Sequence, residues 1–149
     1  MKHKKNCPTT RDLAIAFRRL GDAFATEFCV IGEHIVIDSL AFRQHQTSFK
    51  DDPAGLEAFL NHVHIEELVS QTLPLPANYA ALVEIAERLM RVWSDRMAPL
   101  LKQRQVLFYI GGVDTVSVRF HIERDGEPAW MDISDTQFLR SGENTGLAI

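Results

Sequence analysis

A two-residue Asp125-Gly126 turn between two alternating segments is the strongest constraint on how this chain folds. Asp-Gly suits the tight turn of a β-hairpin, because both central positions must tolerate a positive φ angle. The turn pairs Arg124 with Glu127 and thereby determines the register of the flanking strands. The predicted ladder pairs Ile122 with Ala129, His121 with Trp130, Phe120 with Met131, Arg119 with Asp132 and Val118 with Ile133.

This register separates an apolar face from a polar one, because successive side chains of a strand point to opposite faces. The polar face carries a group that we call the hairpin cluster, which consists of Arg119, His121, Trp130 and Asp132. A preceding strand begins at Val106. A two- or four-residue loop from Gly111 onward places Phe108 and Ile110 on the face of the hairpin cluster, whereas an odd loop places Leu107 and Tyr109 there.

The hairpin cluster has three possible roles. An Arg119–Asp132 ion pair and a His121–Trp130 contact would stabilise the sheet, since such cross-strand pairs contribute about 0.2–1 kcal/mol each. Alternatively, Trp130 with its charged neighbours and Phe108 anchors a surface that binds another protein or a small molecule, because binding hot spots favour Trp, Tyr and Arg. Catalysis would use His121 as an acid or base, but no nucleophile or oxyanion donor is evident beside it, so no catalytic residue is assigned.

Local signals outside the hairpin predict three helices. A helix over 10–25 begins at a Thr9 or Thr10 cap, a second begins at Asp52-Pro53, and the longest runs from about Asn78 until Pro99 limits it. A Gly32-Glu33 turn joins strands over 27–31 and 34–38. Residues 39–51 lack periodicity and are predicted to form an irregular connection, and Phe138 with Leu139 is predicted to form a last helical turn.

These elements predict the α+β class. The expected architecture is a single domain over residues 1–140, with three helices packed over an approximately five-stranded, mainly antiparallel sheet in the order α-β-β-α-α-β-β-β. Residues 141–149 are expected to form a mobile C-terminal tail. A chain of 149 residues with 46% hydrophobic content is large enough to bury a core without disulfides. Its two cysteines lack the spacing of a zinc site.

The charge distribution constrains the partners. The net charge is −4, and most of the acidic excess lies in residues 21–70 and 106–149. Nucleic-acid binding draws its affinity from clustered Lys and Arg, so a nucleic acid is not the expected ligand. No segment has the roughly 18 consecutive apolar residues of a membrane span, and charged residues interrupt the N-terminus before a signal peptide could form. We therefore expect a cytoplasmic protein that does not bind membranes.

Residues 62–66, His-Val-His-Ile-Glu, suggest a different function. On a strand, His62, His64 and Glu66 would project from one side within reach of one metal ion, whereas on a helix they would spread apart. The pattern lacks the fixed spacing of a zinc-finger or metalloprotease motif, so the sequence favours a helix end or loop with solvated histidines over a metal site.

The sequence therefore favours a small protein-binding domain without enzymatic activity, of the inhibitor, immunity or accessory type. It would use its acidic surface and the sheet face around Trp130 to engage another protein, because complementary charge speeds encounter and suppresses wrong partners. No cofactor is expected, and the oligomeric state stays open. The alternative is a metal-binding domain or metal-dependent enzyme centred on His62, His64 and Glu66.

Overall fold

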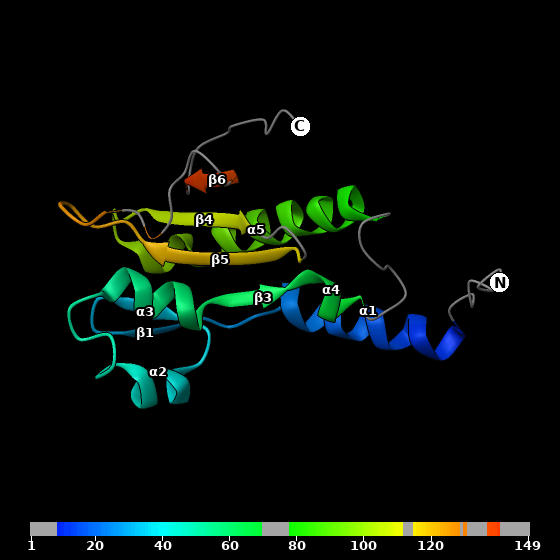
Figure 1. The fold of residues 1–149 in the computed structure, drawn as a ribbon, viewed down its shortest axis with the longest axis horizontal. Helices are drawn as coiled ribbons and strands as arrows, with labels where there is room; N and C mark the ends of the chain where they lie inside the picture. The colour runs from blue at the N-terminus through cyan, green and yellow to red at the C-terminus, as the bar shows by residue number, and fades with distance from the viewer. Residues whose placement is uncertain (1–8, 70–77, 112–114, 129, 131–136, 141–149) are drawn as a thin grey trace.

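The computed structural model describes residues 9–69, 78–111, 115–128 and 130, together with the backbone of residues 137–140 (Figure 1). Its elements follow the order α-β-β-α-α-β-α-α-β-β-β in one compact domain. The predicted α+β class is confirmed. The C-terminal tail predicted at 141–149 lies outside the described residues.

The larger sheet has four antiparallel strands in the order β3-β5-β4-β6. The strands are β3 (His62–His64), β4 (Val106–Gly111), β5 (Ser117–Ile122) and β6 (Gln137–Arg140). In the β4–β5 register, Phe108 pairs with Phe120 and Ile110 with Val118. All four of these side chains are buried in the main core, which they share with the long helix α5 (Tyr79–Leu101).

Helix α1 (Thr10–Phe24) and the short helix α4 (Ile65–Leu68) both contact α5. The indole of Trp93, on α5, donates a hydrogen bond to the carbonyl oxygen of Ala23 on α1 at 2.8 Å. Its ring also meets Phe28 and Phe120 edge-on. Trp93 therefore joins α1, α5 and the larger sheet at the centre of the molecule.

The second sheet is the hairpin of β1 (Cys29–Ile31) and β2 (His34–Val36). Gly32 adopts a φ of 60° in its turn, and Ile31 pairs with His34, so the predicted Gly32-Glu33 turn is confirmed. One face contributes Ile35 to the main core. The opposite face contributes Val36 to a smaller cluster with Phe42 of α2 (Ser39–His45) and Leu56 of α3 (Pro53–Leu60).

Several predicted elements differ from the structure. The single five-stranded sheet with three helices is wrong, because the β1–β2 hairpin forms its own sheet and the described residues contain five helices. Helix α2 occupies part of the predicted irregular connection, since the Asp38 carboxylate accepts hydrogen bonds from the backbone N–H groups of Leu40 and Ala41. Strand β6 replaces the predicted last helical turn.

Helix α5 also continues past Pro99 to Leu101. A proline this close to the end of a helix removes only one intrahelical hydrogen bond. Leu101 is buried in the main core, which holds the last turn in place. The helix ends at Lys102, in the left-handed conformation with a φ of 49°. None of the helices described combines the length and the apolar character that crossing a lipid bilayer requires.

Strand β5 does not form the predicted ladder with the segment that follows it. Its two edges already face β4 and β3. Beyond the last β3 pair, the N–H groups of Phe120 and Ile122 donate to the Asn61 carbonyl oxygen at 3.1 Å and to the Glu57 carboxylate at 2.7 Å. Leu107 pairs with His121 on the β4 edge, Asn61 and Glu57 occupy the other edge, and Trp130 is not part of a strand, so the predicted pairing of His121 with Trp130 is wrong.

The turn at the end of β5 nevertheless forms where the sequence indicates. The Glu127 N–H donates to the Arg124 carbonyl oxygen at 3.2 Å, and Gly126 has a φ of 79°. The remaining predicted partners, Ala129, Met131, Asp132 and Ile133, lie outside the described residues. The Asp-Gly turn therefore redirects the chain without extending the sheet through Trp130.

The loop between β4 and β5 also corrects one predicted site residue. Gly111 pairs with Ser117, which leaves the odd number of five residues, 112–116, between them. Leu107 and Tyr109 therefore share a face with Arg119 and His121. Phe108 lies on the opposite face, fully buried in the main core, so its predicted place beside the hairpin cluster is wrong.

Candidate functional site

One wall of the candidate site is the beginning of α3. Asp52 caps this helix by accepting a hydrogen bond from the Gly55 N–H at 2.8 Å, and Pro53 occupies the first helical position. The Asp52 carboxylate lies so close to Gly55 that a Cβ atom there would be 2.0 Å from Oδ2. Gly55 therefore permits the cap, and the cap fixes the Asp52 carboxylate at the helix start.

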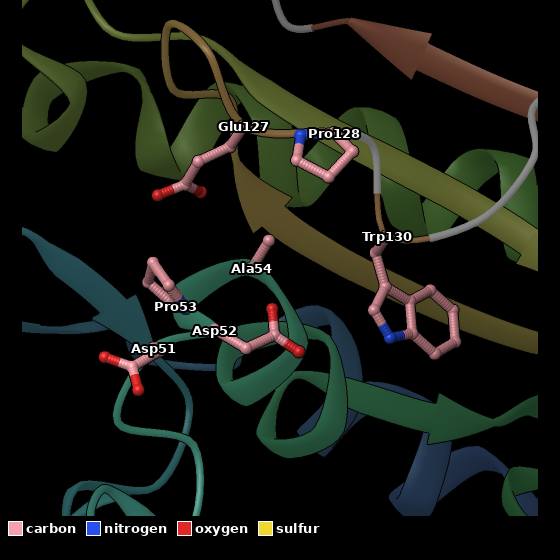
Figure 2. A pocket seen from close by; sticks show the side chains of 7 residues that line it. All are labelled: Asp51, Asp52, Pro53, Ala54, Glu127, Pro128 and Trp130. Atoms are coloured by element: carbon pink, nitrogen blue, oxygen red, sulfur yellow. The ribbon is translucent and has the colours of Figure 1, made fainter.

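The opposite wall follows the Asp125-Gly126 turn. Glu127, Pro128 and Trp130 face the start of α3 across a pocket of about 350 Å³ (Figure 2). The pocket is lined by Asp51, Asp52, Pro53, Ala54, Glu127, Pro128 and Trp130. Three of these residues are acidic, while the indole and the prolines supply apolar surface. We call this hollow the Trp130 pocket.

Contacts on the face of β4 and β5 position the Trp130 ring. The Arg119 guanidinium lies 5.3 Å from the indole centroid, and the Tyr109 ring meets the indole edge-on at 5.8 Å. Arg119 is itself held by a 3.0 Å hydrogen bond to the Ala58 carbonyl oxygen on α3. A cation–π contact of this kind contributes about 0.5–2 kcal/mol, depending on its exposure to water. Trp130 is half-buried, so part of the ring is fixed and part remains accessible.

Hydrogen bonds of His121 hold the Tyr109 side chain on this face. The histidine Nδ1 lies 2.9 Å from the Ile122 carbonyl oxygen, which can only accept a hydrogen bond, so Nδ1 carries a proton. In the neutral ring, Nε2 then accepts a hydrogen bond from the Tyr109 hydroxyl at 2.8 Å. The side chain is buried and both ring nitrogens are engaged. His121 thus orients Tyr109, which in turn contacts Trp130.

A buried ion pair joins the two segments that form the walls of the pocket. Glu57, on α3, is completely buried. Its Oε1 lies 2.6 Å from Nη2 of Arg124, and its Oε2 lies 3.1 Å from Nη1 of the same guanidinium. His34 Nδ1 adds a contact to Oε1 at 2.9 Å. With the Ile122 N–H, these groups surround the carboxylate on both oxygens.

These partners determine the charge of Glu57. Burial alone would raise the pKa of its carboxyl, but hydrogen bonds from His34, Arg124 and the Ile122 N–H outweigh burial and leave the pKa below its ordinary value of 4.5. Burial likewise opposes the charge on Arg124, yet the same carboxylate raises the pKa of the guanidinium. Both groups are therefore ionised at neutral pH.

Arg124 also contacts Glu127, which lines the pocket. Its Nη1 lies 3.8 Å from Oε2 of Glu127, and this oxygen is buried with no hydrogen-bond partner among the described residues. The same guanidinium thus lies between a fully buried carboxylate on α3 and a carboxylate of the pocket.

The structure brings together part of the predicted hairpin cluster. Arg119 and Trp130 are in contact, and His121 reaches Trp130 only through Tyr109. Asp132 lies outside the described residues. Sequence reasoning missed Glu57, Arg124 and the acidic residues at the start of α3. The available signal was a carboxylate directly between Leu56 and Ala58, both of which are buried on α3.

The histidine segment begins in strand β3 of the larger sheet and ends in helix α4, so the predicted helix end or loop for its histidines is wrong. His62 and His64 belong to β3, with ring centroids 5.4 Å apart, and the Glu66 carboxylate lies 3.6 Å from Nδ1 of His64. His62 donates through Nδ1 to the Phe59 carbonyl oxygen at 2.7 Å, and Glu66 accepts from the Val116 N–H at 3.1 Å. Within the described part of the chain, no group of three His, Cys, Asp or Glu side chains is arranged to hold a metal ion.

The described residues define an α+β domain with an acidic, tryptophan-lined pocket between a helix start and a β-turn. The chain belongs to the Uncharacterized protein PM0498 family, whose profile matches residues 3–139. No curated protein and no solved structure gives a significant match.

Proposed function

We propose that this protein is a protein-binding domain without enzymatic activity, of the inhibitor, immunity or accessory type, which engages a partner with a basic surface at the Trp130 pocket. One observation carries the proposal. A half-buried indole, held by Arg119 and Tyr109, shares one pocket with the carboxylates of Asp51, Asp52 and Glu127.

The immobilised indole supports a binding role. Interface hot spots are enriched in Trp and lie in well-packed pockets. A ring already fixed by two neighbours loses little conformational freedom when a partner covers it, so more of the contact energy remains as affinity. The three carboxylates complement a basic partner and favour its encounter over that of an acidic competitor.

The state of His121 supports a role without catalysis. This histidine is the candidate acid or base of the hairpin cluster, and it is buried with both ring nitrogens in hydrogen bonds. The metal-binding alternative gains no comparable support, because His62 and Glu66 already make hydrogen bonds to backbone groups.

The test is capture of a partner by the affinity-tagged protein, compared across three variants and followed by measurement of affinity. Trp130→Ala and Glu127→Lys change the pocket. Leu40→Ala is the matched control, because Leu40 is an exposed apolar residue on α2 that does not line the pocket. One protein should be recovered by the wild type and the control and lost from both pocket variants.

The affinity of the purified pair should then fall about 30-fold or more with Trp130→Ala, the effect of losing a hot spot worth about 2 kcal/mol. Added salt should weaken the wild-type complex more than the Glu127→Lys complex, because the charge attraction is screened. Equal recovery and equal affinity for all variants would exclude the Trp130 pocket as the binding site.

A further inference from the structure

The two walls of the Trp130 pocket come from segments about seventy positions apart in the sequence. Asp51 to Ala54 belong to the start of α3, and Glu127 to Trp130 follow the turn at the end of β5. Figure 2 shows these two groups facing one another across the hollow. The width of the pocket therefore depends on whatever fixes the turn against α3.

The Glu57–Arg124 ion pair makes that connection. Glu57 lies one turn into α3 after the pocket residues, and Arg124 is the first residue of the turn that leads to Glu127. The Arg124 guanidinium donates hydrogen bonds to both carboxylate oxygens of Glu57, at 2.6 and 3.1 Å. It also donates to the Ile122 carbonyl oxygen at 3.2 Å. A two-pronged contact fixes orientation as well as distance, which a single ion contact does not.

Stability alone does not explain a charged pair at this place. Removing two ions from water costs free energy that their attraction often only just recovers, so well-packed apolar side chains would frequently serve a core better. Glu57 also occupies the edge of β5, where its carboxylate accepts the Ile122 N–H at 2.7 Å. The Glu57 carboxylate thereby takes the place of a strand partner for β5. Glu127, Pro128 and Trp130 are then free to face α3.

We propose that Glu57 and Arg124 are positioning residues of the Trp130 pocket, which hold Glu127 and Trp130 at the distance from α3 that binding requires. His34, which contacts Glu57 at 2.9 Å, fixes the carboxylate from the β2 side. The inference rests on the proposed function, because it assigns these residues to the site through which the partner is bound.

The test follows the two indole N–H signals in ¹H–¹⁵N spectra of the free protein. Trp130 and Trp93 are the two tryptophans of the chain, and Trp130→Phe assigns the signals. Glu57→Gln keeps the shape of the side chain but removes its charge, and Arg124→Lys keeps a charge but loses the two-pronged contact. Glu84→Gln is the control, because it breaks the exposed Glu84–Arg88 pair on α5.

Glu57→Gln and Arg124→Lys should shift and broaden the Trp130 signal, with the smaller change in Arg124→Lys. The Trp93 signal should stay in place, because its N–H donates to Ala23 in the main core. Glu84→Gln should change neither signal. If the ion pair were purely structural, these substitutions would shift both indole signals or neither. An unmoved Trp130 signal in a folded Arg124→Lys variant would therefore overturn the inference. This outcome is decisive even if Glu57→Gln fails to fold.

A second measurement separates this inference from the proposed function. N-acetyl-L-arginine amide, titrated into the wild type, tests whether the pocket accepts a basic group at all. Binding that shifts the Trp130 signal, and is at least several-fold weaker in Arg124→Lys, would support both proposals. Absence of binding to the wild type would count against basic-group recognition, while the indole signals of the free variants would still decide whether Glu57 and Arg124 position the pocket.

Discussion

At the scale of single residues, Gly55 shows how a local contact can reverse an ordinary preference. Alanine stabilises a helix interior by about 1 kcal/mol relative to glycine. At position 55, however, a Cβ atom would lie 2.0 Å from the Asp52 carboxylate and displace the cap. Gly55→Ala is expected to lower the free energy of unfolding by about 1 kcal/mol, the usual cost of losing a helix cap.

Gly21, within α1, provides the matched control for this prediction. A Cβ atom there would meet nothing within 4 Å, so Gly21→Ala should raise the free energy of unfolding by about 0.5–1 kcal/mol. Urea unfolding of both variants measures the two changes. Changes of the same sign would show that the contact with Asp52 does not control position 55.

The sequence predicts caps and turns correctly where the contacts join residues that are close together in the chain. The Thr9 cap forms a capping box with Asp12, and Asp52 caps α3 as its place before Pro53 indicates. The Gly32-Glu33 turn also forms as predicted. Each of these contacts spans three residues or fewer. Glu57 could not be recognised in this way, because Arg124 and Ile122, which justify its burial, lie 67 and 65 positions away.

At the scale of elements, one buried side chain joins the two sheets. Asn61 follows α3, and its side-chain amide donates to the Ile35 carbonyl oxygen at 2.7 Å and accepts from the Ile37 N–H at 3.0 Å. Its own carbonyl oxygen accepts from the Phe120 N–H on β5. The amide side chain thus satisfies backbone groups of the β2 segment, while the backbone of the same residue binds the larger sheet.

Asn61→Ala is therefore expected to lower the free energy of unfolding by about 2–3 kcal/mol, because it leaves buried backbone groups near β2 without partners. Urea unfolding measures this loss, and amide hydrogen exchange at Ile37 should accelerate with it. Gln46→Ala, on the exposed end of α2, should change stability by no more than about 0.5 kcal/mol. Unaltered exchange at Ile37 would contradict the proposed link between the sheets.

The same scale explains the errors in the predicted sheet. The Asp-Gly turn was correctly located, but a turn does not reveal whether an edge of the preceding strand is free. The second edge of β5 is taken by β3, Asn61 and Glu57, all more than fifty positions earlier in the sequence. The face of Phe108 depended on whether the following loop has an odd or even number of residues, and periodicity alone does not determine that number.

At the scale of the whole molecule, acid should weaken the fold in two distinct pH ranges. Burial lowers the pKa of His62 below its ordinary value of 6.5, so the folded state resists protonation that the unfolded chain accepts. The contribution of neutral His62 to the free energy of unfolding is therefore fully present above about pH 6.5 and is lost as the pH falls below that value. The carboxyl pKa of Glu57 is also lowered, so its contribution is present above the ordinary value of 4.5 and is lost as the pH falls through the folded-state pKa.

Two single variants separate these ranges when the free energy of unfolding in urea is measured between pH 7.5 and 3.5. His62→Gln should flatten the decline that begins near pH 6.5 and leave the more acidic decline unchanged. Glu57→Gln should be less stable at pH 7 by about 3 kcal/mol, because Arg124 loses its buried counter-ion, and should lose less stability below pH 4.5. A wild-type slope below pH 4.5 that persists undiminished in Glu57→Gln would show that the buried pair does not govern the acid response. The groups that cause the loss of stability in acid would then have to be sought among the other carboxylates, beginning with those of the Trp130 pocket.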